Sequence, residues 1–202
     1  CSARAGLSAR ADYKYEMGHN MKTVGIILSI FIFGLSAAHA NAVDRLLLKS
    51  AGFTELNEAA PEFTVVDAHG LERSLKGLRG KTVVLHLWAT WCKECIKEFP
   101  GFDALYRTYK NRKVEFVFVS VDLNSSQQDI DDFAVRHGAS FPVYLAEKGR
   151  ISEAYWTWGV PETYLIDDTG RIIGRAIGPR DWEGQSMRRL LDSMLEEGIK
   201  TL

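Results

Sequence analysis

Residues 82–100 read TVVLHLWATWCKECIKEFP and join two different hydrophobic patterns. The first seven residues are almost all apolar or β-branched, which predicts a buried strand. From Cys92 onward the spacing predicts an amphipathic helix, because apolar residues return about once per helical turn. These residues are Cys95, Phe99, Phe102 and Leu105. The Cys-x-x-Cys pair is therefore expected where a strand turns into a helix, with Cys92 near the helix N-terminus.

This position favours thiol chemistry. The amides of the first helical turn and the helix dipole stabilise an anion, so the Cys92 thiol should ionise more easily there. The thiolate is the nucleophile in disulfide exchange. Cys95 follows three residues later on the same side of the helix, where it can attack a mixed disulfide formed at Cys92. We predict that Cys92 and Cys95 form a redox-active disulfide and that the protein uses no other cofactor or metal.

Residues 91–95, WCKEC, resemble the redox centre of thioredoxin-like oxidoreductases. Two further landmarks of that superfamily follow in the same order. They are Pro100, which matches its helix-kinking proline, and residues 159–167, GVPETYLID, which match its cis-proline loop and the strand after it. Together with Glu98 and an export signal, these features resemble the TlpA/ResA/CcmG (DsbE) group of exported thiol-disulfide oxidoreductases. The resemblance extends from about Pro61 to the end of the chain.

The resemblance implies an α/β fold, a thioredoxin-like three-layer sandwich with a central mixed sheet and helices on both faces. It also implies an N-terminal β-hairpin within residues 61–74 and a central βα insertion at roughly residues 125–145. The hydrophobic pattern points the same way, because it predicts strands that alternate with helices. Residues 114–121 are apolar almost throughout, as in a central strand buried on both faces. Asp181 is expected to cap the last helix.

The N-terminal part reads as a targeting segment. Met21 and Lys22 open an apolar run that is followed by Ala38-His39-Ala40, the arrangement of a signal peptide with its cleavage site. We therefore divide the chain into residues 1–20, an upstream non-native segment; 21–40, a signal peptide; 41–60, a lead-in; and 61–202, the thioredoxin-like domain. The protein would be periplasmic or otherwise extracytoplasmic. An uncleaved membrane anchor is the alternative, although the run is shorter than the roughly 20 residues of a spanning helix.

Charge and cysteine count narrow the function. The formal net charge is −1 and no basic stretch is present, so no nucleic-acid partner is predicted. With Cys1 in the upstream segment, two cysteines remain, which excludes a small scaffold held by several disulfides. The partner predicted is a protein disulfide. The resemblance implies a monomeric reductase that acts on apocytochrome c or copper-site cysteines. It also implies that a membrane thiol transporter of the CcdA or DsbD type supplies the electrons.

Other readings of Cys-x-x-Cys fit the residues less well. Covalent haem attachment needs a histidine directly after the second cysteine, where Ile96 stands. A zinc site needs two more ligands at suitable spacing, and the sequence has no second cysteine or histidine pair. A peroxidatic cysteine would follow a threonine by three residues, where Ala89 stands, and a copper-delivery protein would use Cys-x-x-x-Cys. The remaining alternative is a metal- or redox-partner-binding module that uses the same two thiols without turnover.

The resemblance also implies a substrate-binding surface around the cysteines. Its members here are Trp91, directly before the pair, and Val160, Pro161 and Glu162 of the cis-proline loop. The backbone of the residue before such a proline is free to pair with a bound substrate strand. Trp156 and Trp158 are candidates for the same groove.

Proton transfer to or from Cys95 is assigned to His86 and Glu98. A buried thiol resists ionisation, so its attack on a mixed disulfide needs a nearby base. In thioredoxins a buried aspartate occupies the position of His86, and strand alternation points His86 away from the face of its neighbours. Glu98 lies about one turn after Cys95. The alternative is structural: a hydrogen-bonded core histidine and a solvated glutamate.

Overall fold

The computed structural model describes residues 45–146, 150–155 and 158–200. The chain divides into two units, residues 1–40 and 41–202, and everything described belongs to the second. The predicted upstream segment and signal peptide lie outside the described residues. In the described part, none of the helices combines the length and the apolar character that a membrane span requires.

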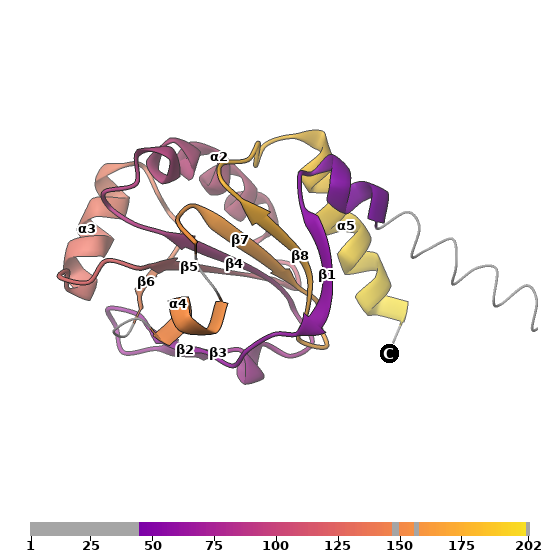
Figure 1. The fold of residues 1–202 in the computed structure, drawn as a ribbon, viewed down its shortest axis with the longest axis horizontal. Helices are drawn as coiled ribbons and strands as arrows, with labels where there is room; N and C mark the ends of the chain where they lie inside the picture. The colour runs from indigo at the N-terminus through magenta and orange to yellow at the C-terminus, as the bar shows by residue number, and fades with distance from the viewer. Residues whose placement is uncertain (1–44, 147–149, 156–157, 201–202) are drawn as a thin grey trace, which may run out of the picture. The chain divides into compact units, whose positions relative to one another are not determined.

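The core of the described part is a six-stranded mixed sheet in the order β1-β8-β7-β4-β5-β6 (Figure 1). The central strand β4 pairs parallel with β5 and antiparallel with β7, and β5 pairs parallel with β6. At the other side, β8 joins β7 to β1, both antiparallel. The strands are β1 (Thr54–Ala59), β4 (Thr82–Trp88), β5 (Val114–Ser120), β6 (Val143–Leu145), β7 (Glu162–Ile166) and β8 (Arg171–Ile177).

Layers cover both faces of this sheet, as predicted. Figure 1 shows α2 above the sheet and α4 below it with a two-stranded hairpin, β2-β3. The buried residues form two clusters, one on each face. Four helices cover the first face: a short helix over residues 45–50, α2 (Lys93–Tyr109), α3 (Gln127–Arg136) and α5 (Gln185–Lys200). The second face is covered by β2 (Thr64–Val66), β3 (Glu72–Ser74), the 3₁₀ turn η1 (Lys76–Leu78) and α4 (Arg150–Tyr155). The thioredoxin-like sandwich with its hairpin and inserted α3-β6 unit is therefore confirmed.

Strand β4 positions the cysteine pair. All seven of its residues are buried, because it lies between β5 and β7 with a helical layer on one side and the hairpin layer on the other. Alternation sends Val84 and Trp88 to the face of α2, and Leu85 and Leu87 to the opposite face. The chain leaves β4 at the edge of the sheet and enters α2 within five residues, at Lys93.

The cysteine pair begins helix α2 as the hydrophobic pattern predicts. Cys92 is the N-cap, with extended φ and ψ of −87° and 96°, and the helix runs from Lys93 to Tyr109. Pro100 lies inside it, where the missing N–H removes one helical hydrogen bond. The apolar side of α2, from Cys95 through Tyr109, packs into the first core cluster.

The structure contains one strand that we did not predict and corrects one predicted helix cap. The predicted lead-in contributes the edge strand β1, which pairs with β8 although only Leu56 among its residues is partly buried. A strand whose side chains nearly all face solvent has no alternating apolar pattern. Such a strand can be recognised only from its backbone pairing with a neighbouring strand. The prediction that Asp181 caps the last helix is wrong, because α5 begins at Gln185.

Candidate active site

The two cysteines form a disulfide at the start of α2, with an S–S distance of 2.03 Å. Cys92 is 7% exposed, whereas Cys95 is fully buried. The backbone N–H of Cys95 donates to Cys92 Sγ at 3.1 Å. An amide that points at this sulfur would stabilise a thiolate there once the disulfide is reduced. The geometry therefore favours ionisation of Cys92 and gives an outside sulfur access to Cys92 rather than to Cys95.

A buried carboxylate fixes the loop that carries Cys92. Asp122, two residues after the end of β5, accepts hydrogen bonds from the backbone N–H of Thr90 at 2.9 Å and from its hydroxyl at 2.7 Å. The hydroxyl of Ser120 donates to the same carboxylate at 2.5 Å. These contacts tie the turn between β4 and α2 to the end of β5. We did not predict this role for Asp122; the one signal in the sequence is an aspartate directly after a buried strand.

The second predicted landmark lies beside Cys92. The Val160–Pro161 peptide bond is cis, and the carbonyl oxygen of Val160 is 3.5 Å from Cys92 Sγ. Trp91 and Trp158 are 67% and 81% exposed. Their loops border the same edge of the sheet, because the C-terminal end of β4 pairs with the N-terminal end of β7. We call Trp91, Trp158 and Val160 the rim of the site; Trp156 lies outside the described residues.

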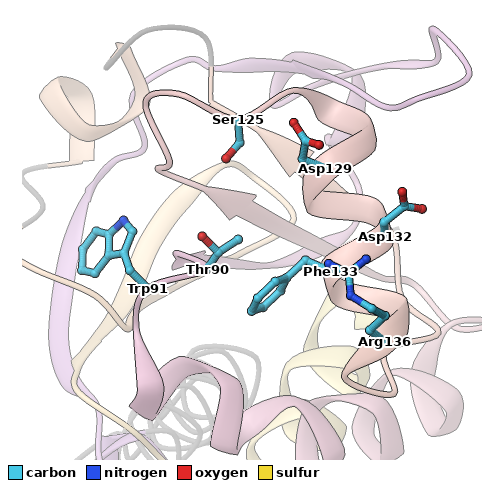
Figure 2. A pocket seen from close by; sticks show the side chains of 7 residues that line it. All are labelled: Thr90, Trp91, Ser125, Asp129, Asp132, Phe133 and Arg136. Atoms are coloured by element: carbon cyan, nitrogen blue, oxygen red, sulfur yellow. The ribbon is translucent and has the colours of Figure 1, made fainter.

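Next to the rim is a hollow of about 330 Å³ between the β4–α2 loop and α3. Figure 2 shows Trp91 and Thr90 on one side of it and the side chains of the α3 region on the other. Those side chains are Ser125, Asp129, Asp132, Phe133 and Arg136. The surface beside Trp91 is thus recessed, and α3, part of the predicted insertion, forms its far wall.

Glu98 is the carboxyl group predicted to serve Cys95. It is only 5% exposed, three residues after Cys95 on α2. Its Oε1 accepts the backbone N–H of Arg180 at 2.8 Å and the indole N–H of Trp182 at 2.5 Å. Its Oε2 has no hydrogen-bond partner among the described residues. Burial raises the pKa of Glu98 from 4.5 to about 7, although the two N–H donors pull it down. The alternative of a solvated surface glutamate is therefore wrong.

We did not predict the two donors to Glu98. Trp182 and Arg180 belong to the loop between β8 and α5, more than 80 residues from Glu98. Nothing in the local sequence announces a contact over that distance.

His86 lies in the core where alternation places it, but its environment suits a structural role. Nδ1 is 2.9 Å from the hydroxyl of Thr163, its register partner on β7, and Nε2 has no partner among the described residues. The ring is fully buried against Phe102, Phe118 and Trp182. Burial lowers the pKa of His86 from 6.5 to about 3, so this imidazole is a poor proton acceptor near neutral pH.

Glu162 is not part of the rim. Its side chain is fully buried and accepts hydrogen bonds from the Tyr164 hydroxyl, at 2.8 Å, and from Arg175. Its neighbour Thr163 faces His86, so alternation turns Glu162 to the opposite face of the sheet from the cysteines. The prediction that Glu162 contacts substrate does not fit this geometry, because a strand residue one position from the rim can face the other way.

The structure was also searched for side chains that could bind a metal ion. Among the described residues, no group of three or more His, Cys, Asp and Glu side chains is arranged to hold a metal ion.

The similarity to known proteins covers the part of the chain that contains the cysteine pair and the cis-proline loop. The profile of the AhpC/TSA family matches residues 56–175. Thiol-disulfide oxidoreductase ResA of Bacillus thuringiensis is 34% identical over 129 residues, 64% of this chain and 73% of ResA. Among solved structures, a Chlorobium tepidum protein assigned as thiol:disulfide interchange protein DsbE is 26% identical, with a TM-score of 0.61 over 70% of this chain and 98% of its own. StoA from Bacillus subtilis is 28% identical, with a TM-score of 0.55 over 66% and 96%.

Proposed function

Since this chain belongs to the AhpC/TSA family and is a thiol-disulfide oxidoreductase similar to ResA, we propose that it reduces disulfide bonds of exported proteins through Cys92 and Cys95. The observation that carries this proposal is the asymmetry of the pair. Cys92, at the helix N-terminus, is 7% exposed, while Cys95 is fully buried, three residues before the buried Glu98.

The reaction has two steps. The Cys92 thiolate attacks one sulfur of the substrate disulfide, the substrate S–S bond breaks, and the other substrate sulfur leaves as a thiolate. Cys95 then attacks Cys92 Sγ and releases the first substrate sulfur. The substrate gains two electrons and becomes a dithiol, and the protein is left with the Cys92–Cys95 disulfide that the structure contains.

Glu98 is the base of the second step. The Cys95 thiol must lose its proton as it attacks, and its burial opposes a free thiolate. With a pKa of about 7, the Glu98 carboxylate is ionised in about half of the molecules at neutral pH and can accept this proton. Because the pKa of His86 is so low, the proposal assigns proton transfer to Glu98 alone and leaves His86 as a core residue.

The rim supports a polypeptide substrate. Trp91 directly precedes Cys92, and Trp158 lies two residues before Val160, whose carbonyl oxygen contacts Cys92 Sγ. Both indoles are exposed, and aromatic side chains are frequent anchors in protein interfaces. Apocytochrome c and copper-site cysteines are the proposed substrates. The proposed setting is the periplasm or another extracytoplasmic space reached through a cleaved signal peptide, with a membrane thiol transporter of the CcdA or DsbD type as electron donor. These last elements rest on the resemblance to exported relatives.

Trapping with matched single-cysteine variants tests the two-step scheme. Reduced Cys95→Ser protein, mixed with a peptide that carries an oxidised Cys-x-x-Cys-His segment, should accumulate a mixed disulfide that dithiothreitol releases. Cys92→Ser, which differs only in which sulfur remains, should accumulate none. Mixed disulfide in Cys92→Ser but not in Cys95→Ser would reverse the assignment, and none in either variant would argue against disulfide exchange with this substrate.

The direction of the reaction is tested separately by equilibrating the cysteine pair with glutathione. We expect a midpoint nearer the reducing end of the range of about −270 to −120 mV covered by proteins of this chemistry. A midpoint near the oxidising end would make the protein an oxidant and contradict the reductase assignment.

A further inference from the structure

The two oxygens of Glu98 are not equivalent. Oε1 accepts two N–H groups, the backbone N–H of Arg180 and the indole N–H of Trp182, while Oε2 has no partner among the described residues. A proton added to Oε1 would compete with two donors that already point at this oxygen. A proton added to Oε2 meets no such donor. The hydrogen bonds therefore select which oxygen is protonated.

Trp182 is rigidly held as a donor. It is almost completely buried and stacks on Phe102, with ring centroids 4.0 Å apart. Its ring also meets the edges of Phe53 and His86, at centroid distances of 6.4 and 6.0 Å. An indole packed on three sides cannot turn its N–H away from Glu98 without disturbing the core.

The second donor is fixed by its own side chain. The Arg180 guanidinium donates to the carbonyl oxygens of Gly52, at 3.1 Å, and of Ile177, at 2.9 Å. These bonds anchor the loop before α5 to two neighbouring segments. The backbone N–H of Arg180 is thereby held at Glu98 while its charged group is engaged elsewhere.

A hollow of about 270 Å³ connects this arrangement to solvent. It is large enough to admit water, so a proton on Glu98 has a path to solvent beside this loop, and no rim residue lines that path. The charged and titratable groups that act on Glu98 or line the hollow are Glu94 and Lys97 of α2 and Arg180, Asp181 and Glu183 of the loop. His86 of β4 packs against the Trp182 ring.

We propose that Trp182 is a positioning residue that holds Glu98 through Oε1 and thereby makes Oε2 the oxygen that receives the proton of Cys95. This inference rests on the proposed function, because it names the group that controls the base of the second step. The indole N–H favours the ionised carboxylate, so it keeps Glu98 ready to accept a proton at neutral pH.

The reaction of the reduced protein with 5,5′-dithiobis(2-nitrobenzoate) separates the two steps. Attack by Cys92 releases one coloured thiolate, and attack by Cys95 on the resulting mixed disulfide releases the second. Trp182→Phe removes the N–H and retains an aromatic ring on Phe102. We expect the pH midpoint of the second release to rise by about one unit, with the first release unchanged, because a hydrogen bond to a charged group has been lost.

Phe53→Leu is the matched control, since it loosens the packing around Trp182 and keeps the N–H. It should leave the midpoint unchanged. An unmoved midpoint in folded Trp182→Phe, or an equal shift in Phe53→Leu, would overturn the inference while leaving both releases, and so the proposed function, in place. Absence of the second release from the unsubstituted protein would instead count against the proposed function.

A measurement on the unsubstituted protein guards against a Trp182 variant that fails to fold. The indole N–H proton resonance of Trp182 should shift with pH with a midpoint of about 7, and Glu98→Gln should abolish the shift. A resonance that does not change across this range would contradict the assigned hydrogen bond.

Discussion

Glu98 and Glu162 are two buried glutamates on opposite faces of the same sheet. In each, Oε1 accepts two hydrogen bonds and Oε2 has no hydrogen-bond partner among the described residues. The donors differ. Glu98 is held by a backbone N–H and an indole N–H, which are neutral, whereas Glu162 is held by the hydroxyl of Tyr164 and the guanidinium of Arg175.

The difference teaches what each carboxyl group can do. Neutral donors only partly offset the cost of burying a charge, so the pKa of Glu98 stays raised at about 7, which suits the base that we propose for Cys95. Glu162 is half of an ion pair that joins β7 to β8. The environment of Glu98 thus suits proton exchange, whereas that of Glu162 links two strands.

The largest effect is expected from Glu98→Gln, which removes the base and keeps the shape. The second step of disulfide exchange should slow by roughly 100-fold at neutral pH, the usual scale of general-base catalysis, with the first step nearly unchanged. Stopped-flow measurement of the two thiolate releases checks this. Glu162→Gln is the matched control on the other face; a comparable slowing in that variant would erase the contrast between the two groups.

Glu162→Gln should instead lower stability. Removing one partner of a buried ion pair leaves the other charge uncompensated, at a cost of about 2–4 kcal/mol after allowance for the partial exposure of Arg175. Urea unfolding measures the loss. The double variant Glu162→Gln/Arg175→Met should recover part of it, and a double variant as unstable as the sum of two independent losses would argue against the pairing.

As pH rises, the free energy of unfolding of Glu98→Gln should increase relative to that of the unsubstituted protein. The pKa of Glu98 is raised from 4.5 to about 7, so its contribution to stability is present below pH 4.5 and is lost as pH rises through 7. Glutamine does not titrate. The variant should therefore gain on the unsubstituted protein by on the order of 1–3 kcal/mol between these limits. Parallel unfolding curves at each pH would contradict the raised pKa.

The smallest effect is expected from substitution of a third buried carboxylate, Asp122, which extends the comparison between Glu98 and Glu162. It binds Thr90 and Ser120, and both are neutral donors, but it serves the loop before Cys92 rather than Cys95. Asp122→Asn should cost about 1 kcal/mol of stability. It should slow the first step a few-fold and leave the pH midpoint of the second step in place. A shift of that midpoint would show that the loop, too, controls Glu98.

Sequence alone predicted the parts that depend on local pattern. The position of α2 agrees with the hydrophobic periodicity, and the cysteine pair lies at the predicted junction. The edge strand β1 was missed because pairing, not burial, defines it. Contacts such as Trp182 with Glu98 join segments far apart in the chain and depend on how a loop folds back.

Two residue assignments show the same limit at the site. His86 was placed in the core correctly, yet its proton affinity depends on the rings of Phe102 and Trp182, which come from α2 and the loop before α5. Glu162 stands next to the proline of the rim in sequence, but the register of β7 against β4 turns it to the other face. The sequence placed both residues near the site, but the packing of distant segments determines the environment of each side chain.

The most direct test of this account is the titration of the Glu98 carboxyl carbon by NMR in the oxidised protein, with Glu98→Gln used to assign the resonance. The account predicts a midpoint at a pH of about 7, because burial raises the pKa of this group. A midpoint near the ordinary value of 4.5 would contradict it, since Glu98 would then be too weak a base for the role that we propose.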